Sequence, residues 1–224
     1  MRGEEIRKYL FLVGEILLTL AGVLLAYLVY QIWFTNQVAE VQSSALATEI
    51  QESFQAGPDS GTVALEAEVE QSKPEGFALL YIPALKSDVW GSPIVSGVEE
   101  RQLSLGVGHY PATELPGEVG NFAVAGHRAT NGEPFARFEK LKSGDLVYVQ
   151  TSEAWFTYQL FQNKKISETD IWVLDDLPEG VVTDSNQLIT LTTCDPRWNS
   201  VRRWAWWGKL IAASDSAPIE VGAQ

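Results

Sequence analysis

The chain has 224 residues, 46% of them hydrophobic and 20% charged, and a net charge of -13. This length suits one domain with an appendage, and the apolar fraction excludes a wholly disordered chain. We expect no nucleic-acid partner, because phosphate neutralisation needs a basic face. One cysteine and two histidines exclude an intramolecular disulfide framework and a cysteine-rich metal site. We therefore expect neither a metal nor a cofactor.

The apolar maximum of the sequence lies in residues 9–34. A helix needs about 20 apolar residues to cross a bilayer, so this segment predicts a transmembrane anchor. Its one charge, Glu15, lies near the N-terminal end, where it can reach lipid headgroups. Tyr27, Tyr30 and Trp33 are expected to form an aromatic belt at the far interface.

The basic residues on either side of this segment predict its orientation. Arg2, Arg7 and Lys8 precede it, and no Lys or Arg follows it until Lys73. The positive-inside rule then places residues 1–8 in the cytoplasm and the rest of the chain outside a single-pass cell-membrane protein.

A cleaved signal peptide is the alternative interpretation of the same segment. Residues 45–47 have the A-x-A form of a cleavage site. They lie too far beyond Phe34 for ordinary cleavage, and the apolar stretch is long for a signal, so the uncleaved anchor is favoured.

Residues 35–75 are polar, acidic and poor in aromatics. Residues 38–54 have the composition to continue the anchor helix, residues 57–61 break it, and residues 73–76 predict a domain boundary. We interpret this segment as a solvated stalk whose negative charge keeps the following domain off the membrane surface.

From residue 76 onward, short apolar segments alternate with Gly- and Pro-containing turns. The expected strands are residues 77–82, 121–125, 145–151, 155–161, 187–193 and 203–212, with one helical turn in 134–140. The third and fourth strands predict a hairpin. This pattern indicates an all-β domain over residues 76–213, either a barrel or a sandwich, with a C-terminal tail at 214–224.

Cys194 ends the expected strand 187–193 and precedes Asp195-Pro196. Since proline stops a strand, the thiol is expected at a rim where a substrate can reach it. The alternative is a buried cysteine that acts as a small hydrophobe. An unpaired thiol in an oxidising extracellular compartment favours a nucleophile.

A nucleophilic cysteine needs a base and a group that stabilises an oxyanion. His127 follows the strand 121–125 as Cys194 follows its own, so the two side chains can face each other across a rim. His109 lies in a Gly- and Pro-rich loop, where a structural role is as plausible as a catalytic one. Arg203 opens the last strand and would be held rigidly there, although an exposed arginine is usually only a solvated charge.

These residues match a family. Thr190–Cys194 (TLTTC), with Arg203 nine residues on, resembles the TLxTC signature of sortases, the cysteine transpeptidases of Gram-positive surfaces. Asn121–Arg128 (NFAVAGHR) is similar to the block around the sortase histidine, and His109–Gly117 (HYPATELPG) resembles a stretch of the mainly actinobacterial class E. The chain departs from the pattern at Ala112, where glycine is usual, and at the tryptophan-rich residues 204–207.

The resemblance implies an eight-stranded sortase-type β-barrel with short helices. It implies that Cys194 attacks the Thr–Gly carbonyl of a sorting signal and that His127 is the general acid/base. Arg203 would hydrogen-bond the substrate or stabilise the oxyanion, and Thr193 would offer its backbone or hydroxyl to the same oxyanion.

The resemblance also implies partners and specificity. The substrates would be surface proteins with a C-terminal LAxTG or LPxTG signal, and the acceptor would be a cell-wall amine on lipid II or a peptidoglycan stem peptide. Tyr110 matches the tyrosine associated with the class E choice of LAxTG, and His109 would be a groove or loop-ordering residue.

Three other functions are weighed against transpeptidation. The first is a protease that uses water as the acceptor. The second is a pilin sortase, although the lack of an aspartate–aromatic lid motif and of a second span argues against the pilin-polymerising class C. The third is a non-catalytic adhesion module, which the presence of all three expected catalytic residues disfavours.

Overall fold

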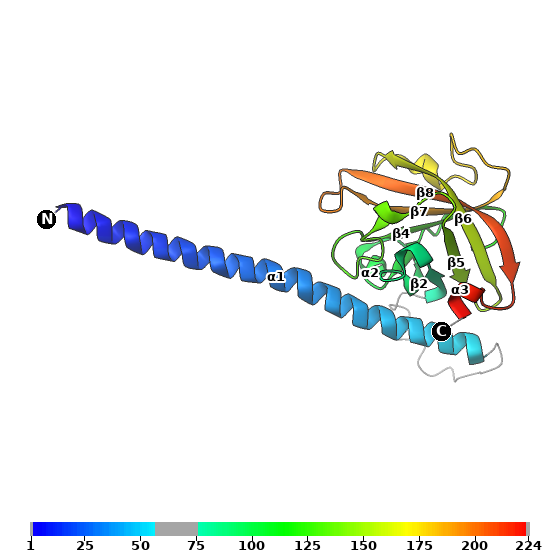
Figure 1. Ribbon diagram of the computed structural model, residues 1–224, viewed down its shortest axis with the longest axis horizontal. Helices are drawn as coiled ribbons and strands as arrows, with labels where there is room; N and C mark the ends of the chain where they lie inside the picture. The colour runs from blue at the N-terminus through cyan, green and yellow to red at the C-terminus, as the bar shows by residue number, and fades with distance from the viewer. Residues whose placement is uncertain (1, 57–75, 223–224) are drawn as a thin grey trace.

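The structure is a computed structural model that describes residues 2–56 and 76–222. One long helix, α1 (Arg2–Ala56), ends alongside a closed β-barrel (Figure 1). The barrel strands are β1 (Gly76–Tyr81), β2 (Trp90–Ser96), β3 (Val107–His109), β4 (Gly120–Gly126), β5 (Leu146–Gln150), β6 (Trp155–Ile166), β7 (Gln187–Asp195) and β8 (Arg202–Ser214). The short helices are η2 (Pro83–Leu85), α2 (Glu100–Leu103), η3 (Phe138–Lys140), η4 (Ile171–Leu174) and α3 (Ile219–Gly222).

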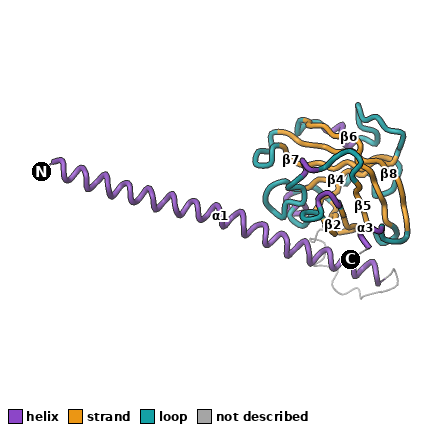
Figure 2. Tube along the Cα trace, viewed as in Figure 1, coloured by secondary structure: helices purple, strands orange, loops and turns teal. Residues whose placement is uncertain are grey.

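The eight strands follow the order β1-β2-β3-β4-β7-β8-β6-β5 and close because β1 also pairs with β5. Two neighbouring pairs, β2–β3 and β4–β7, are parallel. Figure 2 shows the strands as one body, with the short helices on the loops between them. The expected all-β fold with an eight-stranded barrel is confirmed.

The sequence patterns located six of the eight strands and missed β2 and β3. β2 contains Gly91 and Pro93, which in a sequence indicate a turn rather than a strand. β3 has only three residues, too few to show a period. The expected hairpin is present, since β5 and β6 pair antiparallel and the Thr151 N–H donates to the Ala154 carbonyl at 2.9 Å.

The barrel core is formed by alternate residues of the strands, whose side chains point into the barrel. Phe122 and Val124 of β4 and Ile189 and Leu191 of β7 are at most 1% exposed and belong to the main core cluster. Burying such side chains is worth about 1.5–3 kcal/mol each. This packing fixes the two central strands, and it therefore fixes the residues that follow each strand.

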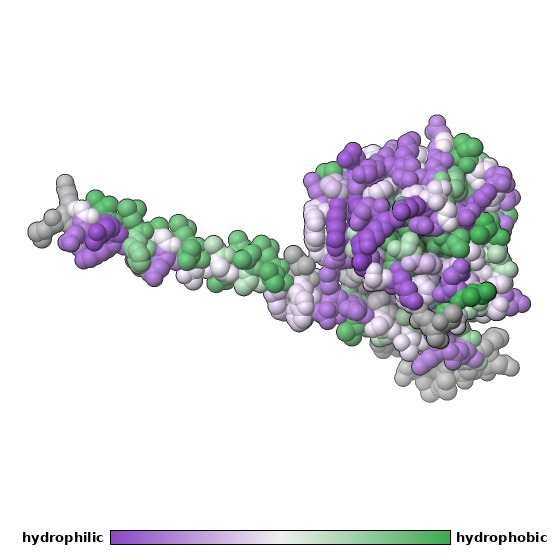
Figure 3. All heavy atoms as spheres, in the orientation of Figure 1, coloured by the Kyte–Doolittle hydropathy of each residue, from purple (hydrophilic) through white to green (hydrophobic). Residues whose placement is uncertain are grey.

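The N-terminal part of α1 carries its apolar side chains outward. Its most apolar 18-residue window has a mean hydropathy of 2.3 and is 0% buried in the structure. Figure 3 shows these hydrophobic residues along the free part of the helix, whereas the visible face of the barrel is mainly hydrophilic. In the part of the chain that the structure describes, α1 is the one helix long and apolar enough to cross a membrane.

The C-terminal part of α1 packs on the barrel. Leu46 and Ile50 are 7% and 3% exposed and share a cluster with Leu79 and Tyr81 of β1. Residues 38–54, expected to continue the apolar helix, lie within α1. The interpretation of residues 35–75 as a solvated stalk is wrong for the part up to residue 56, because one apolar face of this part is buried against the barrel. Residues 57–75, which contain the expected helix breaker and most of the expected boundary, lie outside the described residues.

Candidate active site

The register of three strands brings the expected catalytic residues to one rim of the barrel. β4 and β7 run parallel with Ala125 opposite Thr192. His127 and Cys194 each lie two residues further along their chains, and neighbouring strands are about 4.8 Å apart. β8 runs antiparallel to β7 and places Arg203 directly opposite Cys194. Neighbouring strands thus carry the three residues.

Cys194, His127 and Arg203 line a single groove of about 550 Å³. Tyr110 and Thr193 line it as well, so the structure brings five of the six sequence-predicted site residues together. His109 is not among the described residues that line the groove.

His127 lies in a largely dehydrated position. Its side chain is 16% exposed, and its Nε2 is 3.7 Å from Oε2 of Glu100. Within the described residues this nitrogen has no hydrogen-bond partner. Burial lowers the pKa of His127 below its usual value, and the charge of Glu100 opposes this effect. The imidazole is therefore free to exchange a proton with a substrate in the groove.

Cys194 is half-buried and carries a free thiol. Its backbone carbonyl accepts a hydrogen bond from Nη1 of Arg128 at 3.4 Å. The next residue, Asp195, ends β7, as the proline that follows predicts. The thiol therefore sits on a fixed strand end, with one side open to the groove.

Arg203 is held by the backbone beside it. Its Nη1 donates to the carbonyls of Ser200 at 2.9 Å and Arg202 at 3.1 Å. Its Nη2 lies 3.8 Å from Oε2 of Glu168, and its side chain is 33% exposed. These contacts hold the guanidinium against the backbone of the β7–β8 turn, and Arg203 lines the same groove as Cys194.

Thr193 has less freedom than the resemblance implies. Its hydroxyl donates to the Gly126 carbonyl at 2.7 Å, and the residue is 3% exposed. The hydroxyl proton is thus used to hold β7 against β4, so it is not available to an oxyanion.

Tyr110 lines the groove, and its hydroxyl oxygen can accept a hydrogen bond. Its hydroxyl lies 3.1 Å from Oγ1 of Thr192. The Thr192 hydroxyl donates its single proton to the Val124 carbonyl at 3.1 Å, so Tyr110 is the donor to Thr192. The lone pairs of the Tyr110 oxygen remain free to accept from a substrate N–H.

His109 is a buried residue that orders the loop after β3. It is 4% exposed, and its Nε2 lies 3.0 Å from the Glu114 carbonyl and 3.1 Å from Oγ1 of Thr113. A carbonyl only accepts, so Nε2 carries the proton. Burial lowers the pKa of His109, although these hydrogen bonds oppose it. The proton at this nitrogen is committed to the loop.

An ionic network centred on a buried Arg128–Asp195 pair lies beside His127 and Cys194. Nη1 of Arg128 donates to Oδ1 of Asp195 at 2.8 Å, and Nη2 reaches Oε2 of Glu139 at 3.0 Å. Nζ of Lys165 lies 3.1 Å from Oδ2 of Asp195. Sequence reasoning missed this network. The sequence carries no local signal for it, because the network depends on the parallel pairing of β4 and β7, which brings the residue after His127 next to the residue after Cys194.

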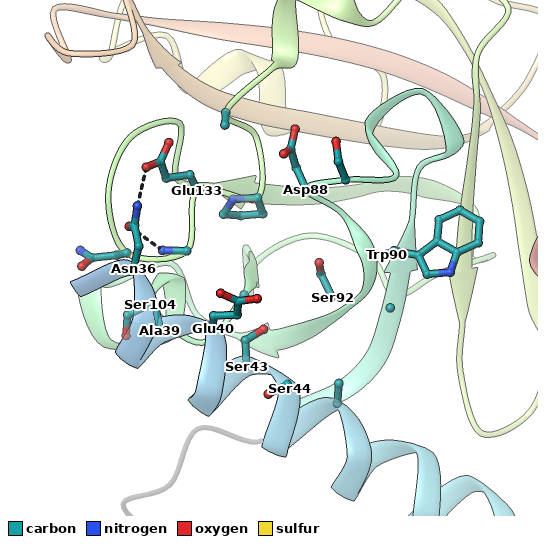
Figure 4. A pocket seen from close by; sticks show the side chains of 18 of the residues that line it. Asn36, Ala39, Glu40, Ser43, Ser44, Asp88, Trp90, Ser92, Ser104 and Glu133 are labelled. Atoms are coloured by element: carbon teal, nitrogen blue, oxygen red, sulfur yellow. Dashed lines mark hydrogen bonds between the residues drawn. The ribbon is translucent and has the colours of Figure 1, made fainter. Parts of the chain in front are cut away.

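A second cavity, of about 770 Å³, is larger than the groove and lies between α1 and the barrel. Its walls include Asn36, Glu40 and Ser43 of α1 and Asp88 and Glu133 of the barrel domain (Figure 4). It contains none of the three expected catalytic residues. Size alone therefore does not identify the site of chemistry.

A closed β-barrel with a cysteine, a histidine and an arginine on one rim defines a cysteine peptidase or acyltransferase. The sequence model of the Sortase domain matches residues 80–211. The chain belongs to the sortase family, whose members are cysteine transpeptidases.

Individual relatives narrow the likeness to class E. The chain is 36% identical to Sortase SrtE1 of Streptomyces coelicolor over 208 residues, which make up 89% of this chain and 56% of that protein. It therefore spans little more than half the length of that relative. Sortase E of Streptomyces avermitilis is 38% identical and superposes with a TM-score of 0.57 over 66% of this chain and 93% of that structure. Sortase E1 of Streptomyces coelicolor with a tripeptide in the active site is 36% identical, with a TM-score of 0.58 over 66% of this chain and 93% of that structure.

Proposed function

We propose that this protein is a membrane-anchored transpeptidase that cleaves an LAxTG- or LPxTG-type sorting signal between Thr and Gly. It forms a thioester with the substrate and transfers the surface protein to a cell-wall amine. The observation that carries the proposal is that Cys194, His127 and Arg203 line one groove at one rim of the barrel.

Acylation begins with the Cys194 thiolate, which attacks the threonine carbonyl carbon. Arg203, across from the thiol, stabilises the negative oxygen of the tetrahedral intermediate. The His127 imidazolium gives its proton to the glycine nitrogen as the C–N bond breaks, which leaves a thioester and a neutral imidazole.

Deacylation reverses these roles. The incoming amine attacks the thioester, neutral His127 takes the proton of that amine, and the C–S bond breaks to regenerate the thiolate. Because the same imidazole must act first as acid and then as base, its access to the groove matters more than a strong hydrogen bond in the resting state.

The small fraction of molecules in which His127 is protonated predicts a slow enzyme. A free imidazole has a pKa near 6.5, so only about 10% of it is protonated at pH 7.5. Burial lowers the pKa of His127 and reduces the imidazolium fraction further. A slow rate is tolerable where enzyme and substrate are tethered to one surface.

The proposed location rests on α1, and the proposed partners rest on membership of the sortase family. Its exposed apolar residues support a single-pass anchor with the N-terminus in the cytoplasm and the barrel outside. The substrates would be surface proteins with a sorting signal, and the acceptor an amine of lipid II or of a peptidoglycan stem peptide. The solved relative with a tripeptide in its active site supports peptide binding in the corresponding groove here.

Product analysis tests the proposal. LAxTG and LPxTG peptides are incubated with the full-length protein in nanodiscs, with and without an added amine. We expect a Thr–amine adduct with amine present, and we expect Cys194→Ala to form no product while it stays folded. A methanethiosulfonate should inactivate the wild type with one adduct per chain. Hydrolysis that an amine leaves unchanged would show a protease, and cleavage by the alanine variant would end the thioester mechanism.

A further inference from the structure

A hydrogen-bonded connection joins α1 to the loop that follows His127. Nδ2 of Asn36 donates to Oε1 of Glu133 at 2.7 Å, and the Gly132 N–H donates to Oδ1 of Asn36 at 3.3 Å. Figure 4 shows Asn36 pointing from α1 toward Glu133. The Glu133 side chain is 13% exposed, so this contact is largely protected from water.

The same carboxylate continues the connection to the turn after Cys194. Glu133 forms an ion pair with Arg197, whose Nε donates to the Arg128 carbonyl at 3.0 Å. The Arg197 guanidinium lies over the Trp198 ring, 5.1 Å from its centroid. Trp198 is 65% exposed, and the Arg197 guanidinium packs on one face of its ring. A series of defined contacts thus links Asn36 of the anchor helix to an exposed tryptophan.

The position of Asn36 along α1 indicates where the linked Trp198 lies relative to the bilayer. Asn36 lies two residues beyond Phe34, the end of the apolar segment, which is about 3 Å along the helix axis. Each headgroup layer is roughly 5–8 Å thick outside the hydrocarbon core. If residues 9–34 cross the bilayer, Asn36 and Glu133 lie within the outer headgroup layer. Figure 1 shows the turn between β7 and β8 at the end of the barrel nearer the N-terminus of α1.

The turn between β7 and β8 has the chemistry of a membrane interface. Residues 196–203 (PRWNSVRR) contain three arginines and no carboxylate, in a chain of net charge -13. Trp198 and Val201 are 65% and 57% exposed. Tryptophan favours the headgroup level, and arginine binds lipid phosphates.

The charges of the turn are not equally available. Glu133 neutralises Arg197, and Arg203 faces Glu168. Arg202 is exposed and forms no ion pair with any described residue. Trp198 also lines the groove of the candidate active site, whereas Val201 and Arg202 do not. These two residues are therefore free to serve a surface function that is separate from peptide binding.

We propose that the β7–β8 turn, residues 196–202, is a membrane-contact surface. Trp198 and Val201 enter the boundary between headgroups and acyl chains of the bilayer that α1 crosses, and Arg202 contacts the phosphates of anionic lipids. This inference rests on the proposed anchoring by α1. It places the groove with Cys194 against the membrane, at the level where the amine of a lipid-linked wall precursor is presented.

Spin-label depth measurements test the proposal in the full-length chain. In a Cys194→Ala background, one nitroxide is attached at Val201→Cys, Ile211→Cys or Leu24→Cys, and each protein is placed in phosphatidylglycerol/phosphatidylcholine nanodiscs. Ile211 is the matched control, since it is 49% exposed on β8, the strand that begins directly after Val201, and lies roughly 30 Å further along the chain direction. Leu24 reports on the anchor.

We expect oxygen to reach the label at Val201 more readily than a nickel chelate does, as at Leu24, and the opposite order at Ile211. An aqueous label at Val201 together with a buried label at Leu24 would overturn the membrane-contact surface and leave the anchor intact. An aqueous label at Leu24 would overturn both.

A kinetic comparison provides a second readout. Val201→Asp should lower transfer to an amine displayed on a lipid headgroup several-fold and leave transfer to a soluble amine unchanged. Ile211→Asp should change neither rate. If Val201→Asp lowers transfer to both amines equally, Val201 acts through the groove. If Val201→Asp transfers to both amines at the wild-type rate, the turn does not contact lipid. Either result would refute the proposal.

Discussion

Arg128 and Asp195 form a buried ion pair, 2.8 Å from Nη1 to Oδ1, that links the residue after His127 to the residue after Cys194. The two side chains are 9% and 4% exposed. The pair crosses from the loop after β4 to the end of β7, so it ties the loop that carries His127 to the strand end that carries Cys194. The Arg128 guanidinium also lies over the Trp204 ring at 5.2 Å, so the tryptophan-rich start of β8 supports the same network.

Loss of one partner of this pair is expected to destabilise the fold. Arg128→Met should lower the free energy of unfolding by about 3 kcal/mol, because it leaves Asp195 buried with less compensation. It should also lower kcat/KM at least tenfold at temperatures where the protein stays folded, because small displacements of reacting groups are costly. Urea denaturation and peptide cleavage measure the two effects.

Lys209→Met is the control for this prediction. Lys209 pairs with Asp184, whose side chain is 80% exposed, and such pairs are worth about 1 kcal/mol or less. Equal destabilisation by Arg128→Met and Lys209→Met would contradict the assigned role of the buried pair.

The pair also predicts a component of acid sensitivity. Burial raises the pKa of Asp195, but hydrogen bonds and charge from Lys165 and Arg128 outweigh it, so the pKa lies below its usual value. A depressed pKa in the folded state contributes stability above the unfolded value near 3.9, and this contribution is lost as the pH falls through the folded value. Stability measured between pH 7 and pH 3 should therefore fall more steeply in the wild type than in Asp195→Asn. Parallel curves would contradict the prediction.

The two histidines are expected to have different roles, His127 in catalysis and His109 in stability. His127→Ala should reduce kcat/KM by about 10²–10⁴, the usual contribution of general acid–base catalysis, with little change in melting temperature. His109→Ala should mainly lower the melting temperature, because the buried Nε2–H orders Thr113 and Glu114. Thermal unfolding and peptide cleavage are measured on both variants. Greater loss of activity in His109→Ala than in His127→Ala would reverse the assignment.

Glu100 is expected to tune the pH profile of the reaction. Its charge raises the pKa of His127 against the larger effect of burial, so Glu100→Gln should move the acidic limb of kcat/KM to lower pH. With a lower pKa, fewer molecules carry imidazolium together with thiolate, so the plateau should fall as well. The change should be a few-fold at most and should shrink in high salt, because the Glu100 side chain is 73% exposed. Glu99→Gln is the control, and an identical profile in wild type and Glu100→Gln would refute the prediction.

Tyr110 is expected to contribute to substrate choice. Alanine at the second position of the signal has an N–H that proline lacks, and the Tyr110 oxygen has free lone pairs because its proton goes to Thr192. One such hydrogen bond favours LAxTG by about 1 kcal/mol, or several-fold. In competition assays, Tyr110→Phe should shrink this preference without abolishing LPxTG cleavage. Unchanged selectivity would mean that the ring only packs under the loop.

The long strands and the position of the candidate nucleophile could be predicted from local patterns. β7 is β-branched and apolar up to Thr193 and ends at Asp195, directly before Pro196, so its end and the position of the Cys194 thiol follow from residues close in sequence. β2 was not predictable in this way, because Gly91 and Pro93 are accommodated by pairing with β1 and by an irregular register. Strand pairing across the barrel overrides the local preference for a turn.

The sequence by itself determined the long apolar segment and the all-β domain, and it singled out Cys194, His127 and Arg203 as the proposed catalytic residues, because these depend on composition, on period and on motifs of nearby residues. Only the tertiary structure decided which partners each side chain has. The hydrogen bond from Thr193 to Gly126, the buried Arg128–Asp195 pair and the contact from Asn36 to Glu133 join residues far apart in the chain. The physical reason is that a hydrogen bond or ion pair depends on distances of about 3 Å, which strand register and helix packing set and sequence separation does not.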